Sequence, residues 1–319
     1  MSVCSRKTDR ARILVTPRSM TRGPHPSTDL IHESDYERVC AEAGKQPSRE
    51  ELRALLPGCV GWIAGVEPID RSLLEHAESL RAISRNGIGT DSIDTEACRE
   101  RGIAVLTAGN ANSQSVAELT VALLLSIARS IPFHDSELRA GRATRRRGFE
   151  LNGKRIGIIG YGNIGGRVVE LSRCLGMIPL VFDTSAEVRR EARQVAHVAD
   201  HVEDLFRSCD IVSLHCPPPR DGTALVDRDA VAAMPPGTVL LNTARAQLVE
   251  EQAILSGYES GRILAYGTDV LMHEPPEESE LLSREETIAT PHIGGYTSQG
   301  VDRVSQMAVH NLLDYLGKH

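Results

Sequence analysis

Short apolar runs alternate with polar, helix-like stretches along the first hundred residues of the chain. The runs lie in the segments RILVTPRS, GWIAGVEP, LRAISRNGIG and GIAVLTAGN, each of which ends in residues that favour turns. Polar stretches such as DRSLLEHAESL and DSIDTEACRERG separate them. This alternation is typical of βα units, in which strands pair in parallel and helices cover the sheet. The pattern therefore predicts an α/β domain in this part of the chain.

A second series of the same kind begins at Lys154, with apparent strands in RIGIIG, IPLVFD, DIVSLHC, TVLLNTA, ILAYGTDV and TIATPH. Six strands are the number expected of a complete dinucleotide-binding sheet. Between the two series, apolar residues recur at helical spacing over residues 113–131, and Ser115 and Glu118 fit a capping box. The pattern of apolar positions over residues 298–316 predicts a second amphipathic helix. Its apolar face comprises Val301, Val304, Ala308, Leu312 and Tyr315.

Length, charge and cysteine spacing limit the class of protein. A chain of 319 residues is longer than one core usually holds, which favours two domains. The net charge of −7 argues against nucleic acid as a general partner, because phosphate binding needs a basic face. No segment is apolar for long enough to span a membrane. The seven cysteines form no CxxC pair, so reduced thiols in a cytoplasmic protein without a metal site are the simplest interpretation.

A glycine-rich turn, IGIIGYGNIGG, joins the first strand of the second series to the helix that follows it. Gly160 allows the tight turn, Gly162 lets the backbone approach a pyrophosphate, and Gly165 lets the helix pack against the strand. The helix N-terminus offers free N–H groups to phosphates. Asp183 ends the next strand, where a carboxylate suits a ribose 2′-hydroxyl and repels a 2′-phosphate. The loop therefore favours NAD over NADP, the alternative being an ordinary strand–helix turn.

Three polar residues stand where strands of the second series should end, namely Arg245, Glu274 and His292. The carboxyl ends of parallel strands face the ligand crevice, so the three side chains are expected to converge. Arginine binds a carboxylate with a planar fork, histidine exchanges a proton near neutral pH, and a neighbouring glutamate would favour the imidazolium. With a nicotinamide, these groups suffice to reduce a 2-keto acid. Singly, each has another explanation: a surface arginine, a solvated carboxylate in an acidic loop, and a buried histidine.

The chain resembles the D-isomer-specific 2-hydroxyacid dehydrogenases over nearly all of its length. The similarity lies in SRNGIGTDSID, NSQSVAELTVALLLSIAR, GKRIGIIGYGNIGGRV, LNTARAQLVEEQAI, YGTDVLMHEPP and TPHIGGYTSQ. It implies two Rossmann-like or flavodoxin-like α/β domains with parallel sheets, the cofactor domain being inserted into a discontinuous substrate domain. Residues 1–109 and 292–319 would form the substrate domain, and residues 110–291 the NAD-binding Rossmann domain. Members usually pair through the cofactor domain, so a homodimer is expected.

The resemblance also implies an activity, the NAD-dependent interconversion of a D-2-hydroxy acid and its 2-keto acid. Arg245 would bind the substrate and polarise its carbonyl, and His292 would donate or accept the proton with Glu274 as its partner. Asp269 matches the acid that the family places near the nicotinamide amide. The substrate carboxylate would lie on the backbone of Asn86, Gly87, Ile88 and Gly89. Further cofactor contacts are expected from Asn163, Ile164, Cys216, Pro217, Thr243 and Gly294.

The chain departs from the family pattern at two places. Ala246 follows Arg245 where the family usually has glycine, which puts the loop backbone near the site in doubt. The tryptophan that usually precedes GFELNGK is missing. Four arginines crowd that region instead, and a solvated loop is the expected structure. They are Arg142, Arg145, Arg146 and Arg147.

Two arginines of the first α/β series bear on the nature of the substrate. Arg18 and Ser19 follow the first strand and Arg85 follows another, so both arginines are candidates for binding a second anion such as a phosphonate, phosphate or carboxylate. Alternatively, one or both point to solvent. Gly65 and Val66 stand where phosphoglycerate enzymes usually have a basic residue, which counts against phosphoglycerate.

Two other functions remain open at this point. An NAD(H)-sensing, corepressor-like binding protein could share the fold and keep the Arg–Glu–His set. Dehydrogenation of a one-carbon acid such as formate needs a narrow apolar pocket and is less suited to the arginines.

Overall fold

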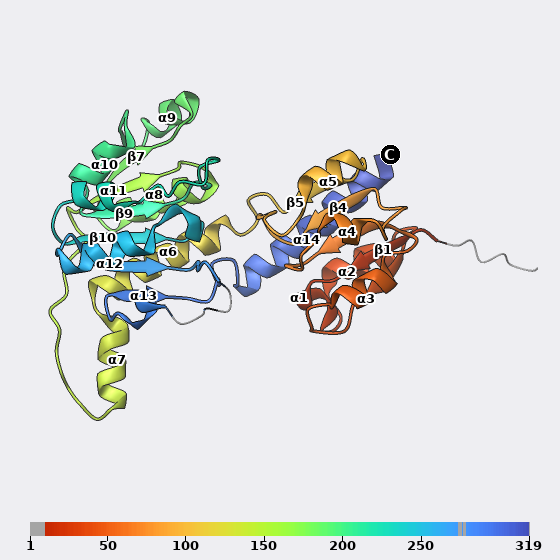
Figure 1. Ribbon diagram of the computed structural model, residues 1–319, viewed down its shortest axis with the longest axis horizontal. Coiled ribbons are helices and arrows are strands. Elements are labelled where there is room, and N and C mark those ends of the chain that lie inside the picture. Colours follow the sequence, from red (N-terminus) through yellow and green to blue (C-terminus); the bar gives the residue numbers. More distant parts are fainter. Residues whose placement is uncertain (1–9, 274–275, 277–278, 319) are drawn as a thin grey trace, which may run out of the picture. The chain divides into compact units, whose positions relative to one another are not determined.

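The computed structural model describes residues 10–273, 276 and 279–318, which form two compact units (Figure 1). Unit 1 comprises residues 10–112 and 298–318, and unit 2 comprises residues 113–297. Both boundaries lie a few residues further along the chain than the expected 109/110 and 291/292. The first falls where a helix begins at Ser113, and the second falls after the loop of His292, which hydrogen bonds keep in unit 2.

Unit 1 contains a parallel five-stranded sheet in the order β2-β1-β3-β4-β5, which is the flavodoxin-like order. The edge strand β2 was not predicted, because its sequence ERVC is polar and none of its residues is fully buried. The strands are β1 (Arg12–Val15), β2 (Glu37–Cys40), β3 (Cys59–Ala64), β4 (Ala82–Arg85) and β5 (Ala104–Thr107).

Alternate residues of β1 enter two separate cores, one on each face of the unit 1 sheet. Leu14 packs with Trp62 against the helices between the strands, whereas Ile13 and Val15 pack against the C-terminal helix α14. This helix, predicted over 298–316, spans Ser298–Lys318 and buries Val304, Ala308 and Leu312 of the expected face. The helices of unit 1 are α1 (Arg18–Thr21), α2 (Pro26–His32), α3 (Arg49–Leu55), α4 (Arg71–Leu74), α5 (Thr95–Glu100) and α14.

Unit 2 contains a parallel seven-stranded sheet in the order β12-β11-β10-β9-β6-β7-β8, a Rossmann order with one added strand. All six predicted strands are present, and the seventh, β8, has only two residues. The strands are β6 (Arg155–Ile159), β7 (Ile178–Phe182), β8 (His197–Val198), β9 (Ile211–Leu214), β10 (Thr238–Asn242), β11 (Ile263–Thr268) and β12 (Thr287–Ala289).

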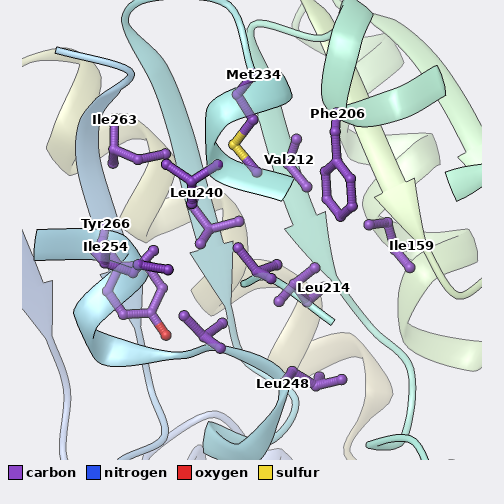
Figure 2. Close-up of a cluster of buried hydrophobic side chains, with 14 of the residues drawn as sticks. Ile159, Phe206, Val212, Leu214, Met234, Leu240, Leu248, Ile254, Ile263 and Tyr266 are labelled. Carbon is purple, nitrogen blue, oxygen red and sulfur yellow. The ribbon is translucent and has the colours of Figure 1, made fainter. Parts of the chain in front are cut away.

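The strands of unit 2 are covered by helices, and its larger core includes Phe206, Met234, Leu240, Ile254 and Tyr266 (Figure 2). A second cluster contains the buried face of helix α6, so apolar side chains fill both sides of the sheet. The helices are α6 (Ser113–Ala128), α7 (Ile131–Arg139), α8 (Asn163–Cys174), α9 (Ala186–Ala192), α10 (Val202–Ser208), α11 (Arg228–Ala233), η1 (Ala246–Leu248), α12 (Glu251–Glu259) and α13 (Glu280–Ser283).

The helix predicted over residues 113–131 is shorter than expected and has no capping box. It begins at Ser113, two positions before the expected cap, and the Ser115 hydroxyl hydrogen bonds to the Thr297 hydroxyl at 2.8 Å. It ends at Ala128 because Ser130 takes a left-handed backbone with φ 48°, after which α7 starts with Pro132 in its first turn. Within the described residues no single helix is suited to cross a membrane, and α6 with α7 passes the criterion of length and composition only as a pair bent by 62°.

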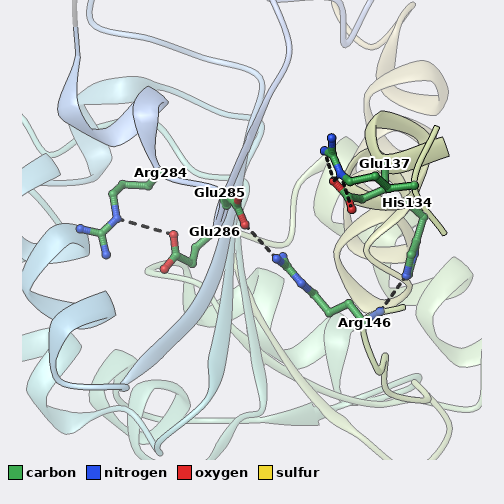
Figure 3. Close-up of polar contacts among 7 residues, drawn as sticks. His134, Glu137, Arg146, Arg284, Glu285 and Glu286 are labelled. Atoms are coloured by element: carbon green, nitrogen blue, oxygen red, sulfur yellow. Dashed lines mark hydrogen bonds and ion pairs between the residues drawn. The ribbon is translucent and has the colours of Figure 1, made fainter. Parts of the chain in front are cut away.

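The arginine-rich segment after α7 is extended, as expected of a loop, but two of its arginines are paired (Figure 3). The Arg146 guanidinium donates to Glu285 at 2.8 Å and lies 3.9 Å from the centre of the Phe133 ring. Arg142 forms a forked ion pair with Glu137, which lowers the pKa of that carboxyl to about 2. The segment is therefore tied to α7 and to the start of β12.

Candidate active site

Most of the residues predicted to bind the cofactor or catalyse the reaction lie along one edge of the unit 2 sheet. Because all seven strands run in parallel, the loops that follow their carboxyl ends lie at the same edge. The glycine turn follows β6, Asp183 follows β7, and Cys216 and Pro217 follow β9. Thr243 and Arg245 follow β10, Asp269 follows β11, and His292 and Gly294 follow β12.

The glycine turn is crowded at two of its three glycines and open at the third. A Cβ atom at Gly160, whose φ is 94°, would lie 2.6 Å from the carbonyl oxygen of His215. A Cβ at Gly165 would lie 2.0 Å from the carbonyl oxygen of Gly160. Beside Gly162, no described atom lies within 4 Å of the position of a Cβ. The turn therefore needs glycine for its own packing and leaves space in front of Gly162.

The helix that follows this turn begins with free N–H groups. Gly162 is the N-cap of α8, and among the described residues no side chain caps this end. Asn163 and Ile164 open the helix beside the space at Gly162. A helix N-terminus with open space in front of it attracts an anion, so a dinucleotide pyrophosphate fits this place.

Asp183 connects the glycine turn to the end of β7. Its Oδ2 accepts from the Tyr161 N–H at 2.9 Å, and its Oδ1 accepts from the Ser185 N–H at 2.9 Å. Each carboxylate oxygen can accept a second hydrogen bond, so the group can still receive ribose hydroxyls. Nearby after β9, burial raises the pKa of the Cys216 thiol to about 11, and the thiol therefore adds no negative charge near neutral pH.

Asp269 holds the loop that bears His292. Its carboxylate is almost fully buried and accepts from the Thr290 hydroxyl at 2.6 Å and from the N–H groups of Ile293 and Gly294, both at 2.7 Å. His292 lies between these donors with φ 54°, a left-handed conformation that is uncommon for a histidine. Its own N–H donates to Thr290 O at 3.0 Å, and its side chain is exposed. The buried carboxylate thus fixes the backbone on which the candidate acid–base group stands.

Arg245 is half-buried at the end of β10, in a loop that does not need glycine. The Asn242 side-chain amide donates to Arg245 O at 2.8 Å, and the Arg245 guanidinium donates to Ala244 O at 2.7 Å. Ala246 is not among the described non-glycine residues with positive φ, and it opens the short helix η1. The departure from glycine therefore causes no backbone strain. On the same edge, Thr243 hydrogen bonds through its hydroxyl to Thr120 of α6 at 2.8 Å.

The predicted substrate residues and Glu274 are placed differently. Glu274 lies outside the described residues. Arg18 is an exposed first residue of α1 and Ser19 is half-buried beside it. The Arg85 guanidinium turns back on its own loop, where it donates to Asn86 O at 2.7 Å and lies 2.8 Å from the position that a Cβ at Gly87 would take. Arg85 therefore shapes the loop from Asn86 to Gly89, in which one side-chain amide atom of Asn86 is buried with no described partner.

His215 is a half-buried polar residue of this edge that the sequence analysis missed. It follows β9 and hydrogen bonds through Nε2 to the Ser213 hydroxyl at 2.8 Å, while its buried Nδ1 has no partner among the described residues. Burial lowers the pKa of the imidazole to about 3. The ring is therefore neutral at physiological pH, and it is the backbone carbonyl of the same residue that lies against Gly160. Nothing in the pattern SLHC distinguishes such a histidine from an exposed one.

These features together define a Rossmann-type dinucleotide-binding protein with a candidate acid–base histidine on the cofactor edge of its sheet. Residues 121–294 match the family model described as D-isomer specific 2-hydroxyacid dehydrogenase, NAD binding domain. The chain belongs to this family, and its cofactor is NAD.

Individual relatives and a solved structure agree with this assignment. The chain is 35% identical to the (S)-sulfolactate dehydrogenase of Chromohalobacter salexigens, covering 89% of this chain and 94% of that protein. It is 34% identical to the D-3-phosphoglycerate dehydrogenase of Methanocaldococcus jannaschii over 85% of this chain, but it spans only about half of that protein, 53%. The crystal structure of the TT0316 protein from Thermus thermophilus matches with a TM-score of 0.86 and 31% identity over 97% of each chain.

The low pKa of His215 predicts how stability depends on pH. In the unfolded chain this histidine takes up a proton near its ordinary pKa of 6.5, whereas in the folded chain it does so only near 3. Protonation therefore favours the unfolded state, and the free energy of unfolding should decrease as the pH falls from 6.5 toward 3. Urea unfolding at a series of pH values should show a smaller decrease for His215→Leu than for the wild type. The exposed His201→Gln is the matched control, and equal slopes for wild type and His215→Leu would contradict the assignment.

Proposed function

We propose that this protein is an NAD-dependent dehydrogenase that interconverts a D-2-hydroxy acid and its 2-keto acid. The observation that supports this most is the fixed, strained backbone of His292 at the cofactor edge. A histidine held in a left-handed conformation by a buried carboxylate is typical of a functional position, because strain of roughly 1–3 kcal/mol persists only where the surroundings impose it. Arg245, which ends the strand two places along the sheet, supplies the complementary charge.

Each of the candidate site residues has a defined role in the proposed reaction. When bound, NADH supplies the hydride. The Arg245 guanidinium binds the keto acid and polarises its carbonyl, and the exposed His292 imidazole donates a proton to the carbonyl oxygen as hydride arrives. Glu274, which lies outside the described residues, is the proposed partner of His292 in this transfer. The Asn86 and Gly87 N–H groups already donate to Ala64 O and Arg85 O, so the N–H groups of Ile88 and Gly89 bind the substrate carboxylate. The reverse reaction uses the same groups.

Substitution of His292 and Arg245 tests the proposal with a panel of 2-keto acids. His292→Asn should lower kcat by about 10²–10⁴, the usual contribution of a positioned general acid, with little change in the Kd of NADH. Arg245→Lys should raise KM, because an ammonium lacks the planar fork. The rate of NADH oxidation and the quenching of protein fluorescence by NADH measure the two effects. Tight NADH binding by the wild type without turnover of any keto acid would reject the proposal and favour an NADH-sensing protein.

We also propose that the substrate has a second anionic group, bound by Arg18 together with Arg85. Support comes from the position of Arg18 after β1, at the carboxyl edge of the unit 1 sheet, and from the (S)-sulfolactate dehydrogenase relative, whose substrate has two anionic groups. Arg85 is engaged with its own loop, so Arg18 makes the larger direct contribution.

Arg18→Ala should therefore raise KM about tenfold for phosphohydroxypyruvate or sulfopyruvate, since losing a charge-assisted hydrogen bond costs about 1.5–3 kcal/mol. KM for pyruvate and glyoxylate should stay nearly constant. Steady-state kinetics with both groups of substrates decide the question. The exposed Arg53→Ala on α3 serves as the control, and equal changes for monoanions and dianions would show that Arg18 binds no second anion.

We propose that the protein forms a homodimer through unit 2. Helix α7 supports this, because it stands away from the sheet of unit 2 in Figure 1 and none of its residues, all of them described, is buried. Ile131 and Leu138 on this helix are 54% and 68% exposed. Exposed apolar side chains on a helix that buries none of its residues favour a protein interface. The described cysteines are all free thiols, which supports a reducing, cytoplasmic location.

Light scattering tests the dimer. The wild type should have the mass of two chains, and Ile131→Glu with Leu138→Glu should shift it toward one chain, because charges would replace apolar contacts. Ile178→Glu, at an exposed apolar position elsewhere in unit 2, is the control. A wild type that remains a single chain at high concentration would exclude this assembly.

A further inference from the structure

A buried carboxylate lies between the carboxyl ends of two central strands of unit 1. Glu67 follows β3 and is only 2% exposed, although it belongs to a loop at the edge of the sheet. In the order β2-β1-β3-β4-β5, the connections reverse direction between β1 and β3. Ligands bind to open α/β sheets in the crevice at this reversal, so Glu67 occupies a functionally important place.

One oxygen of Glu67 joins the loops that follow β1 and β3. Its Oε1 accepts a hydrogen bond from the Thr16 hydroxyl, directly after β1, and a 2.9 Å hydrogen bond from the Gly65 N–H, directly after β3. The same hydroxyl accepts from the Trp62 indole N–H at 3.0 Å and from the Gly65 N–H at 3.2 Å. Thr16 is itself buried. The two loops are therefore connected through one charged group shielded from water, where such bonds are strong.

The other oxygen fills the space in front of Gly65. A Cβ atom at Gly65 would lie 2.7 Å from Oε2 of Glu67 and 3.4 Å from the Cα atom of Pro17. No described residue donates a hydrogen bond to Oε2. The connection between the loops thus needs only one acceptor oxygen, and it needs glycine at position 65.

The third loop of the crevice is tied to the same strand end. The Asn86 N–H, at the start of the proposed substrate loop, donates to Ala64 O at 2.8 Å, next to Gly65. Arg18 begins α1 only two positions after Thr16. We propose that Glu67 is a positioning residue for substrate binding, which uses Thr16 and Gly65 to hold the loops of Arg18 and Asn86 in register. This inference rests on the proposed dehydrogenase function.

A matched set of variants separates positioning from general stability. Glu67→Ala and Thr16→Val remove the connection between the loops. Glu67→Gln keeps one acceptor oxygen, and Thr16→Ser keeps the hydroxyl. Asp70→Ala is the control, because Asp70 caps α4 and pairs with Arg49 elsewhere in unit 1. The readouts are KM and kcat for the best keto acid, the Kd of NADH, the Tm, and deuterium uptake by residues 14–22 and 60–68 without substrate.

Glu67→Ala and Thr16→Val should each raise KM about tenfold, as expected when a charge-assisted hydrogen bond is lost. Their kcat and Kd of NADH should stay within about twofold of the wild-type values. Deuterium uptake in both segments should rise. Glu67→Gln and Thr16→Ser should behave like the wild type, and Asp70→Ala should lower the Tm without changing KM.

Three results would overturn the inference. KM could stay constant in Glu67→Ala while the Tm falls, which would make Glu67 merely structural. Glu67→Gln could be as impaired as Glu67→Ala, which would mean that the charge or Oε2 meets the substrate directly. Unchanged deuterium uptake in Glu67→Ala would show that no connection exists. Deuterium uptake is measured without turnover. A wild type that is inactive on every keto acid would therefore reject the proposed reaction, whereas the uptake of Glu67→Ala would still test whether Glu67 holds the two loops.

Discussion

Parallel pairing of strands is the constraint on which both units depend. A parallel sheet brings every loop that follows a strand to the same edge, however far apart these loops are in the sequence. In unit 2 this places the glycine turn after β6 beside His215 after β9, so closely that only glycine fits at Gly160. In unit 1 it brings Thr16 and Glu67 together. The chemistry of the protein is therefore assembled by strand order and not by proximity along the chain.

Buried carboxylates serve the same purpose in both units. Asp269 and Glu67 each have 2% exposure, and each accepts hydrogen bonds from loops at the carboxyl edge of its sheet. A buried charge is costly unless donors surround it, and here backbone N–H groups and threonine hydroxyls provide them. These hydrogen bonds restrict the conformation of loops whose own short sequences would leave them free to move. Asp269 adds a further effect, because it stabilises a backbone conformation that a histidine rarely adopts.

Much of this arrangement follows from patterns in the sequence. Short apolar runs predicted ten of the twelve strands, and the loops that bear the glycine turn and Asp183 lie at one edge of the unit 2 sheet, where the prediction of a cofactor site stands. The polar edge strand β2 and the two-residue β8 lack that signal, so they were missed. The capping box at Ser115 was wrong because the serine bonds to Thr297, a residue remote in sequence. Likewise, the direction of the Arg85 side chain and the role of Glu67 depend on neighbours that only the fold brings close.

The position of α14 in the chain has a consequence for synthesis on the ribosome. Its residues Ala308, Val309, Leu312 and Leu316 cover Ile13, Val15 and Ile63, yet they are made after the whole of unit 2. A nascent chain that has reached residue 297 has an apolar face of the unit 1 sheet still open to water, while unit 2 can already close its own cores. The core of unit 1 on this face can therefore be completed only after the last helix has been made, whereas the inserted unit has all of its own residues by then. During that interval the uncovered face is the part of the nascent protein most exposed to aggregation and to chaperones.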